Sequence, residues 1–208
     1  MCAVLVRAGV VVVLALTVPG GWAGAQPAGE AAIPAAACEG CGAADAPKAL
    51  TSEARIAPAG EPGTPLVVTG VVYRPDGRTP APGVLVYAYH TNAAGVYPRR
   101  IGATGNARRH GSLRGWLRTD ARGRYRLTTI RPAPYPRRES PAHIHLSVTP
   151  PGGEERWIDS ILFDDDPLLT ARRRAELRNV GGPGVVRVTR GLDGVLRAAR
   201  DVVLERWP

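Results

Sequence analysis

Two histidines and two tyrosines carry the clearest chemical signal in this chain. His143 and His145 are separated by one residue, so alternation along a β-strand would put both imidazoles on one face. Tyr135 lies eight residues before His143, in Arg-Pro-Ala-Pro-Tyr-Pro, and Tyr97 lies further upstream in Ala-Gly-Val-Tyr-Pro. Imidazoles accept many metals, whereas anionic phenolate oxygens are hard donors that favour Fe(III). The four side chains are therefore candidate ligands of a ferric ion.

Taken singly, these residues have a plainer interpretation. A His-x-His pair is more often two polar residues on one sheet face, and a lone tyrosine is more often a turn or core residue. Tyr87 and Tyr125 fall in strand patterns, so we interpret them as packing residues. Four further polar residues could flank a pocket but are expected at surface or turn positions: His90, His110, Asp164 and Asp166.

Residues 1–25 have the features of a secretory signal peptide. Arg7 supplies the positive start, residues 8–18 are apolar, and Ala23-Gly24-Ala25 is a small-residue cleavage site. The apolar run is about eleven residues long, whereas a membrane-spanning helix needs roughly 20, so an uncleaved anchor is the less favoured interpretation. We expect a secreted or periplasmic mature protein with no integral membrane span.

Residues 26–63 are rich in alanine, glycine and proline, which predicts a flexible extension ahead of the domain. The extension contains a C-x-x-C pair, Cys38 and Cys41, without a second such pair or a βαβ context. In an oxidising compartment we favour a disulfide, within the pair or to another chain, over a redox motif or half of a zinc site.

Residues 64–208 predict an all-β domain with long loops. The 25 glycines and 20 prolines favour many turns over a helical bundle. Only residues 168–178 are helix-like, so we expect one short helix. Runs of β-branched and aromatic residues, spaced as in a β-sandwich, predict strands at 66–73, 84–90, 115–118, 125–130, 143–149, 157–163, 185–189 and 195–204.

The formal net charge of +9 comes from scattered arginines, and aromatic residues make up only 5% of the chain. No compact basic stripe with stacking aromatics is present, which argues against nucleic-acid binding. A basic surface instead favours small anionic partners. The oligomeric state, a homo-oligomer included, stays open.

Four motifs then follow one another in the centre of the chain: Gly95-Val96-Tyr97; Thr119-Asp120 with Gly123-Arg124-Tyr125; Thr129-Ile130-Arg131-Pro132-Ala133-Pro134-Tyr135-Pro136; and Pro141-Ala142-His143-Ile144-His145. In this order they resemble the intradiol ring-cleavage dioxygenases, the family of catechol and protocatechuate dioxygenases. The resemblance is densest over residues 95–163 and extends over about 66–204. Exported members of the family are similar to this chain in having a signal and an extension.

The resemblance implies a β-sandwich of the intradiol dioxygenase type, which is transthyretin- or prealbumin-like. It implies that Tyr97, Tyr135, His143 and His145 bind non-haem Fe(III), with Tyr135 and His145 axial and a solvent molecule as fifth ligand. It further implies an oxidoreductase that uses O2 as co-substrate and incorporates both of its atoms, opening a catechol-type ring to a muconate-type diacid. No organic cofactor is implied, and the activity would belong to aromatic compound catabolism.

Two positions depart from the family pattern. Ser140 stands where protocatechuate-type enzymes have an arginine, and Ser160 stands where a glutamine is expected. Polar donors at such positions can contribute about 3 to 4 kcal/mol in a transition state. The departures therefore keep two alternatives open: a catalytically weak relative that binds phenolics or metal, and a non-catalytic transthyretin-like binding domain.

Overall fold

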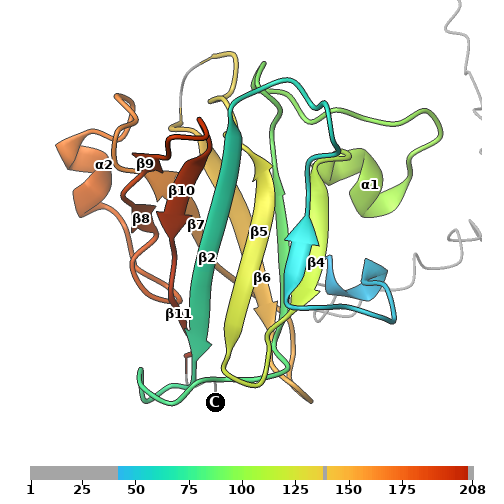
Figure 1. The fold of residues 1–208 in the computed structure, drawn as a ribbon, viewed down its shortest axis with the longest axis vertical. Coiled ribbons are helices and arrows are strands. Elements are labelled where there is room, and N and C mark those ends of the chain that lie inside the picture. The colour runs from blue at the N-terminus through green and yellow to red at the C-terminus, as the bar shows by residue number, and fades with distance from the viewer. Residues whose placement is uncertain (1–41, 138–139, 206–208) are drawn as a thin grey trace, which may run out of the picture. The chain divides into compact units, whose positions relative to one another are not determined.

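The computed structural model describes residues 42–137 and 140–205, which form mainly short strands in two sheets (Figure 1). The strands are β1 (Glu53–Arg55), β2 (Pro65–Tyr73), β3 (Leu85–His90), β4 (Arg114–Arg118), β5 (Arg124–Ile130), β6 (His143–Thr149), β7 (Arg156–Phe163), β8 (Val185–Val186), β9 (Thr189–Arg190), β10 (Leu196–Ala199) and β11 (Val202–Val203). The helices are η1 (Ala43–Asp45, a 3-10 turn), α1 (Gly105–His110) and α2 (Ala171–Ala175). In Figure 1, α1 and α2 lie at opposite sides of the view.

The two sheets confirm the predicted all-β sandwich. One sheet has the order β1-β5-β2-β10-β9, with β11 also paired to β2, and the other has the order β4-β3-β6-β7-β8. Strands β3, β4, β6 and β7 pair antiparallel, whereas the short strands β1, β8 and β11 add to their neighbours in parallel. The centre of the second sheet is therefore a regular platform for side chains.

Strand β6 shows how the sequence sets this platform. Ile144, Leu146 and Val148 alternate along it and are at most 1% exposed, because they face the core between the sheets. Burying each of these side chains contributes about 1.5 to 3 kcal/mol. The same alternation sends His143 and His145 to the outer face of the sheet.

Two predicted strands are interrupted. The run at 185–189 is divided because β8 pairs with β7 while β9 pairs with β10, so the chain changes sheets between them. The run at 195–204 is broken between β10 and β11 at Arg200, which is 1% exposed. Its guanidinium donates to Gly182 O at 2.9 Å, and next to it Val71 N of β2 donates to the Asp201 side chain at 2.9 Å in place of a backbone carbonyl.

The expectation of one short helix is wrong, since the described residues contain two α-helices. α1 was missed because it begins at Gly105 and lacks an apolar period. α2 covers only part of the expected stretch at 168–178: Thr170 forms its N-cap by accepting from Arg173 N at 3.3 Å. None of the helices in the described ranges is long and apolar enough to cross a membrane.

Part of the stretch expected to be a flexible extension belongs to the folded domain. β1 pairs with β5, and Ile56 and Ala57 are 4% and 3% exposed in the core. Ahead of β1, the Glu155 carboxylate accepts from Gly42 N at 3.0 Å and from Ala43 N at 2.9 Å. Composition alone missed this because the anchoring partners are distant in sequence: β5 pairs with β1 across 73 residues, and Glu155 lies more than 100 residues from Gly42 and Ala43. The expected cleavage site, Cys38 and Cys41 lie outside the described residues.

Candidate metal centre

The four sequence-predicted ligands converge on the outer face of the second sheet. His143 and His145 come from β6, where their neighbours on either side, such as Ile144, point into the core. Tyr97 comes from the loop after β3 and Tyr135 from the loop after β5. The structure therefore brings together side chains from three separate stretches of the chain, all of which were named from sequence.

The two tyrosine loops are held against each other by backbone contacts. Asn92 braces the first loop, because its Oδ1 accepts from Ala94 N at 3.0 Å and from Val96 N at 3.2 Å. Gly95 has a φ of 76°, and a Cβ built there would lie 2.0 Å from Pro134 O. Only glycine permits this approach, which places the tyrosine loops side by side.

The terminal atoms of the four side chains form one cluster. Tyr97 Oη lies 2.6 Å from Tyr135 Oη and 3.0 Å from His145 Nε2. Tyr135 Oη lies 3.2 Å from His143 Nε2 and 3.4 Å from His145 Nε2, and the two Nε2 atoms are 3.0 Å apart. Donors held about 2 Å from a common cation are separated by about 2.8 to 3.3 Å. The cluster therefore has the size of a metal coordination shell.

The four side chains carry too few hydrogens to make every short contact in the cluster a hydrogen bond. His143 Nδ1 lies 2.7 Å from Pro141 O, and because a carbonyl only accepts, Nδ1 carries the hydrogen and Nε2 is a bare lone pair. Two phenol hydrogens, with at most one more from His145, can serve three of the five short contacts. The remaining contacts bring lone pairs together, which a cation among them would relieve.

The protonation states follow from burial. Burial lowers the pKa of His145 to about 3, and the neighbouring His143 shifts it in the same direction. Burial also lowers the pKa of His143, so both imidazoles are neutral at neutral pH. Burial and the hydrogen bond with Tyr135 raise the pKa of Tyr97. Only a strong local positive charge would make that phenol release its proton, as a bound metal ion does.

Phenols are indispensable to this donor set. No group of three or more His, Cys, Asp or Glu side chains that could hold a metal occurs in residues 42–137 and 140–205. Two neutral imidazoles supply no charge, whereas two phenolates supply two negative charges to a cation. The residues present therefore fit a hard, highly charged ion such as Fe(III).

Two cavities flank the cluster. The first, named here the aromatic cavity, has a volume of about 460 Å³ and is lined by Tyr89, Tyr97, Arg109, His110, Tyr135, His145 and Trp157. The second, of about 380 Å³, lies on the α2 side and includes Ser140, His143, His145, Ser160, Arg173 and Arg178. A small ligand can therefore approach the four donors from two directions.

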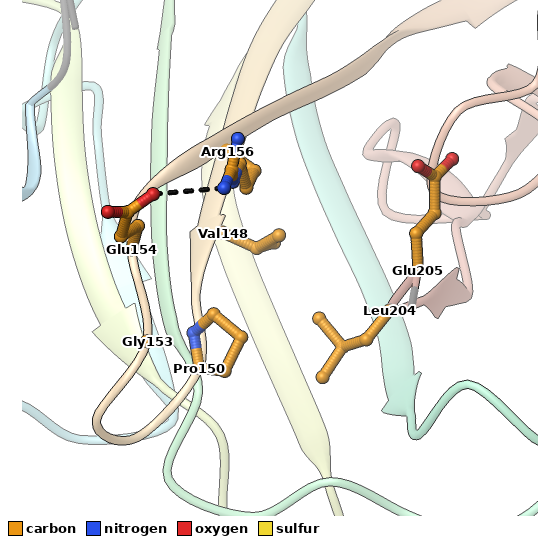
Figure 2. Close-up of a pocket in the computed structure, with 7 residues that line it drawn as sticks. All are labelled: Val148, Pro150, Gly153, Glu154, Arg156, Leu204 and Glu205. Atoms are coloured by element: carbon orange, nitrogen blue, oxygen red, sulfur yellow. Dashed lines mark hydrogen bonds and ion pairs between the residues drawn. The ribbon is translucent and has the colours of Figure 1, made fainter. Parts of the chain in front are cut away.

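A third cavity is unrelated to the metal centre. It measures about 310 Å³ and lies beside the turn that joins β6 to β7, as Figure 2 shows. The ion pair between Glu154 and Arg156, 2.9 Å, lies at its edge, and Leu204 lies across from it. Its lining contains no histidine or tyrosine, so it offers none of the donors described above.

A β-bulge places Ser160 beside the metal centre. Ile144 pairs with Ile161 and Leu146 with Ile158, so Asp159 and Ser160 together stand opposite the single residue His145. Ser160 Oγ lies 3.5 Å from His145 Nδ1, too long for a strong hydrogen bond. Ser140 lines the α2-side cavity with Ser160, so both departures from the family pattern lie next to the donors.

The two histidines that were expected at surface or turn positions, His90 and His110, are buried. His90 is 0% exposed and links the sheets: its Nε2 lies 2.6 Å from Thr129 Oγ1, and its Nδ1 donates to Thr91 O at 2.7 Å. His110 is 3% exposed and lines the aromatic cavity. Apart from Thr91, the hydrogen-bond partners of these two rings lie 23 and 39 positions away, so no local pattern reveals their burial. Tyr87 and Tyr125 are buried, as expected of packing residues.

Asp166, also expected at the surface, is 7% exposed and holds the start of β6. Its Oδ2 accepts from Ala142 N at 2.7 Å and its Oδ1 from Leu168 N at 2.8 Å. This carboxylate fixes the backbone on which Pro141 O orients the His143 ring. The sequence pattern around Asp166 indicated only an acidic turn and did not predict its contact with β6.

Asp166→Ala is expected to lower the free energy of unfolding by about 1 to 3 kcal/mol, because the buried N–H of Ala142 and the partly buried N–H of Leu168 lose their acceptor. The measurement is urea denaturation of the variant against the wild type. Asp165→Ala is the matched control, since Asp165 is more exposed and pairs with Arg131 at 2.6 Å, a contact worth under about 1 kcal/mol. Equal losses in both variants would contradict the role given to Asp166.

Comparison with known proteins agrees with this geometry. A family model described as dioxygenase matches residues 42–176. The chain is 37% identical over 117 residues to the protocatechuate 3,4-dioxygenase beta chain of Burkholderia cepacia, covering 53% of this chain and 49% of that one. It is 31% identical over 153 residues to catechol 1,2-dioxygenase 2 of Acinetobacter lwoffii, covering 60% and 54%. The chain thus spans about half the length of these curated relatives.

Solved structures share the fold. The dioxygenase domain of a dioxygenase carbohydrate-binding protein fusion from Streptomyces sp. SirexAA-E has a TM-score of 0.56 at 23% identity, over 77% of this chain and 92% of that one. Catechol 1,2-dioxygenase from Acinetobacter sp. ADP1 has a TM-score of 0.56 at 23% identity, over 76% and 58%. At these identities the likeness concerns the architecture of the two sheets.

Proposed function

The chain belongs to the intradiol ring-cleavage dioxygenase family, and we propose that it is a non-haem Fe(III) enzyme that cleaves a catechol-type ring with O2 to a muconate-type diacid. The observation that carries the proposal is the cluster of Tyr97, Tyr135, His143 and His145, whose terminal atoms lie 2.6 to 3.4 Å apart without enough hydrogens to satisfy them. These four residues would hold the ion.

Ferric iron in such a site supplies Lewis acidity toward a catechol, whose electron density it withdraws. The protein supplies position and proton acceptors. Tyr97 and Tyr135 line the aromatic cavity. A tyrosine oxygen accepts a proton only as a phenolate, so Tyr135 held as a phenolate could take up one hydroxyl proton of an entering catechol. His143 is kept in one tautomer by its bond to Pro141 O, which holds Nε2 toward the cluster.

The site also keeps bulk water from much of the donor set. The His145 ring stacks on Tyr89 with centroids 4.4 Å apart, and Trp157 meets it edge-on at 6.5 Å. Both rings line the aromatic cavity beside the imidazole. A flat aromatic substrate suits such walls, because rings pack well both stacked and edge-on.

We also propose that the enzyme is exported, on the strength of the signal-like residues 1–25. An exported enzyme would meet catechols outside the cytoplasm, and a small-molecule catechol is the partner that the aromatic cavity favours. The same signal-like segment predicts that a full-length precursor is larger than the mature protein by about 25 residues.

A second candidate function is a relative that binds phenolics or metal with little ring cleavage. Ser140 and Ser160 favour it, because both positions next to the donors carry a short hydroxyl in place of the longer donors of the family pattern. The charged residues that line the same cavity, Arg173 and Arg178 with Asp159 and Glu176, are balanced in number and favour neither candidate. A measurement of ring cleavage distinguishes the two candidate functions.

The purified protein reconstituted with ferric iron is expected to be red-brown, because tyrosinate bound to Fe(III) absorbs visible light by charge transfer. Adding catechol is expected to shift this band and to start O2 uptake with formation of a diacid. The measurements are the visible spectrum, an oxygen electrode and product analysis. A shifted band without O2 uptake would favour the second candidate, and a colourless protein free of iron would refute the proposed iron enzyme.

A further inference from the structure

The loop between β3 and α1 carries an isoleucine that the fold leaves uncovered. Ile101 is 107% exposed, and Val96 in the same loop is 45% exposed. Within residues 42–137 and 140–205, the other large apolar side chain that is exposed is Leu192, at 111%. Single exposed apolar residues are common on protein surfaces, so exposure alone assigns no role to Ile101. Its backbone and its charged neighbours decide the matter.

A hydrogen-bonded turn places Ile101 at the tip of this loop. Ala103 N donates to Arg100 O at 3.1 Å, so residues 100–103 form a β-turn with Ile101 at its second position. Gly102 follows with a φ of 77°, the conformation that the third position of a type II turn requires. In Figure 1 the loop that leads into α1 reaches out to one side of the two sheets. An ordered backbone therefore presents the isoleucine to the outside.

All the charged side chains along residues 91–119 are arginines. This segment contains no Asp or Glu, and its arginines are Arg99, Arg100, Arg108, Arg109, Arg114 and Arg118. Arg99 and Arg100 directly precede Ile101, and both are exposed. The apolar tip of the loop is therefore flanked by guanidiniums.

Helix α1 adds a further cation beside the loop. Arg100 and Ala107 of α1 line one cavity of about 340 Å³, so the turn and the helix lie next to each other. Arg108, the residue after Ala107, is exposed. Arg114 lines the same cavity and is held by Asp45 at 2.9 Å, which spends that carboxylate on β4. The lining of the cavity itself includes no Asp or Glu.

Leu192 has the same exposure in different surroundings. It lies in the turn between β9 and β10, directly before Asp193. The Asp193 carboxylate pairs with Arg197 at 2.6 Å, so an anion stands beside the exposed leucine. The combination of an uncovered apolar side chain with arginines alone is thus a property of the loop before α1.

We propose that Arg99, Arg100, Ile101 and Arg108, called the basic tip from here on, dock the protein on an anionic lipid surface. The guanidiniums meet the negative headgroups, and Ile101 enters the interfacial layer, where its side chain leaves water. A dissolved polyanion satisfies the arginines but buries no isoleucine. A second copy of the chain brings its own positive charge to the contact, which repels. The proposal is independent of the proposed function, because it uses none of the four donors.

The test measures co-sedimentation of the full chain with vesicles of phosphatidylglycerol and phosphatidylcholine in equal parts, with phosphatidylcholine vesicles as the neutral reference. Ile101→Ser is expected to weaken binding to the anionic vesicles about tenfold, because the burial of an apolar side chain is lost. Leu192→Ser is the matched control, equally exposed in the native chain, and is expected to stay within about twofold of the wild type.

The arginines are tested as a pair. Replacing Arg99 and Arg100 together by Gln is expected to weaken binding to the anionic vesicles about tenfold or more, and to reduce its dependence on salt. The control replaces Arg55 of β1 and Arg126 of β5 by Gln, which are exposed in the other sheet. It changes the net charge equally, so a loss confined to the first pair reports on position. Circular dichroism checks that each variant is folded.

Three results would overturn the proposal. One is a wild type that binds anionic and neutral vesicles equally. Another is equal binding by Ile101→Ser and Leu192→Ser, or by the two arginine pairs. If dissolved polyphosphate bound through Arg99 and Arg100 while vesicle binding ignored Ile101, the basic tip would belong to a polyanion. The third is self-association in analytical ultracentrifugation that Ile101→Ser abolishes, without vesicle binding, which would assign the tip to a second copy.

Discussion

Tyr135→Phe is expected to reduce the affinity of the protein for ferric iron by more than about 100-fold, because even the outer partners of metal ligands contribute 10- to 100-fold. Tyr135 Oη contacts three donor atoms, at 2.6, 3.2 and 3.4 Å. Its loss removes one negative charge and opens one side of the cluster. The measurements are iron stoichiometry after dialysis and the intensity of the visible band.

Tyr125→Phe is the matched control, because it removes a hydroxyl from another tyrosine outside the site. Tyr125 Oη donates to Arg200 O at 2.6 Å in the core, so its loss is expected to lower the free energy of unfolding by about 1 to 3 kcal/mol with iron binding retained. His145→Ala should behave as Tyr135→Phe does. If Tyr135→Phe kept its iron and colour, the four-donor centre would be disproved.

Gly95→Ala is expected to abolish iron binding although residue 95 donates nothing to the cluster. The added Cβ would lie 2.0 Å from Pro134 O, so one of the two tyrosine loops must move. Displacing either loop separates Tyr97 from Tyr135 and takes at least one of the four donors out of the cluster. The core is expected to stay intact, because both loops lie outside the sheets. Iron content and circular dichroism, measured on one preparation, check both statements.

Gly102→Ala is the control that distinguishes two reasons for a glycine at residue 95: its positive φ and the close approach of the second loop. Gly102 lies in the same loop with a φ of 77°, close to the 76° of Gly95, but a Cβ there would meet nothing within 4 Å. The two variants therefore share the backbone strain, about 1 kcal/mol or more, and differ only in the close approach. Iron binding equal in both variants would show that the contact between the loops does not position the tyrosines.

The strands could be predicted from sequence where the pattern involves only neighbouring residues. The alternation of β6 predicted that His143 and His145 share a face, and the paired strands β2 to β7 match the predicted runs within one residue at either end. Alternation is a property of neighbouring residues, so it needs no knowledge of the partner strands. For the same reason the broken strands beyond residue 184 were missed, since one break comes from a change of sheet and the other lies where the Asp201 side chain takes a backbone donor of β2.

The site could be predicted only in part. The four donors were named because their spacing resembles a known family, but the residues that surround them were not. Tyr89 meets His145 through strand register, and His110 meets Tyr87 and Tyr89 through the packing of α1 on the sheet. Asp166 acts on a backbone N–H 24 positions away. Such pairings are set by three-dimensional packing and leave no trace in short sequence windows.

One consequence of the alternation in β6 concerns insertions and deletions. The same seven residues, His143–Thr149, supply apolar contacts on one side and the imidazoles on the other. A shift of the strand register by one residue would place both imidazoles in the apolar core and would move Ile144 and Leu146 to the outer face of the sheet. An insertion or deletion inside this segment is therefore expected to disrupt the core and the imidazole pair together.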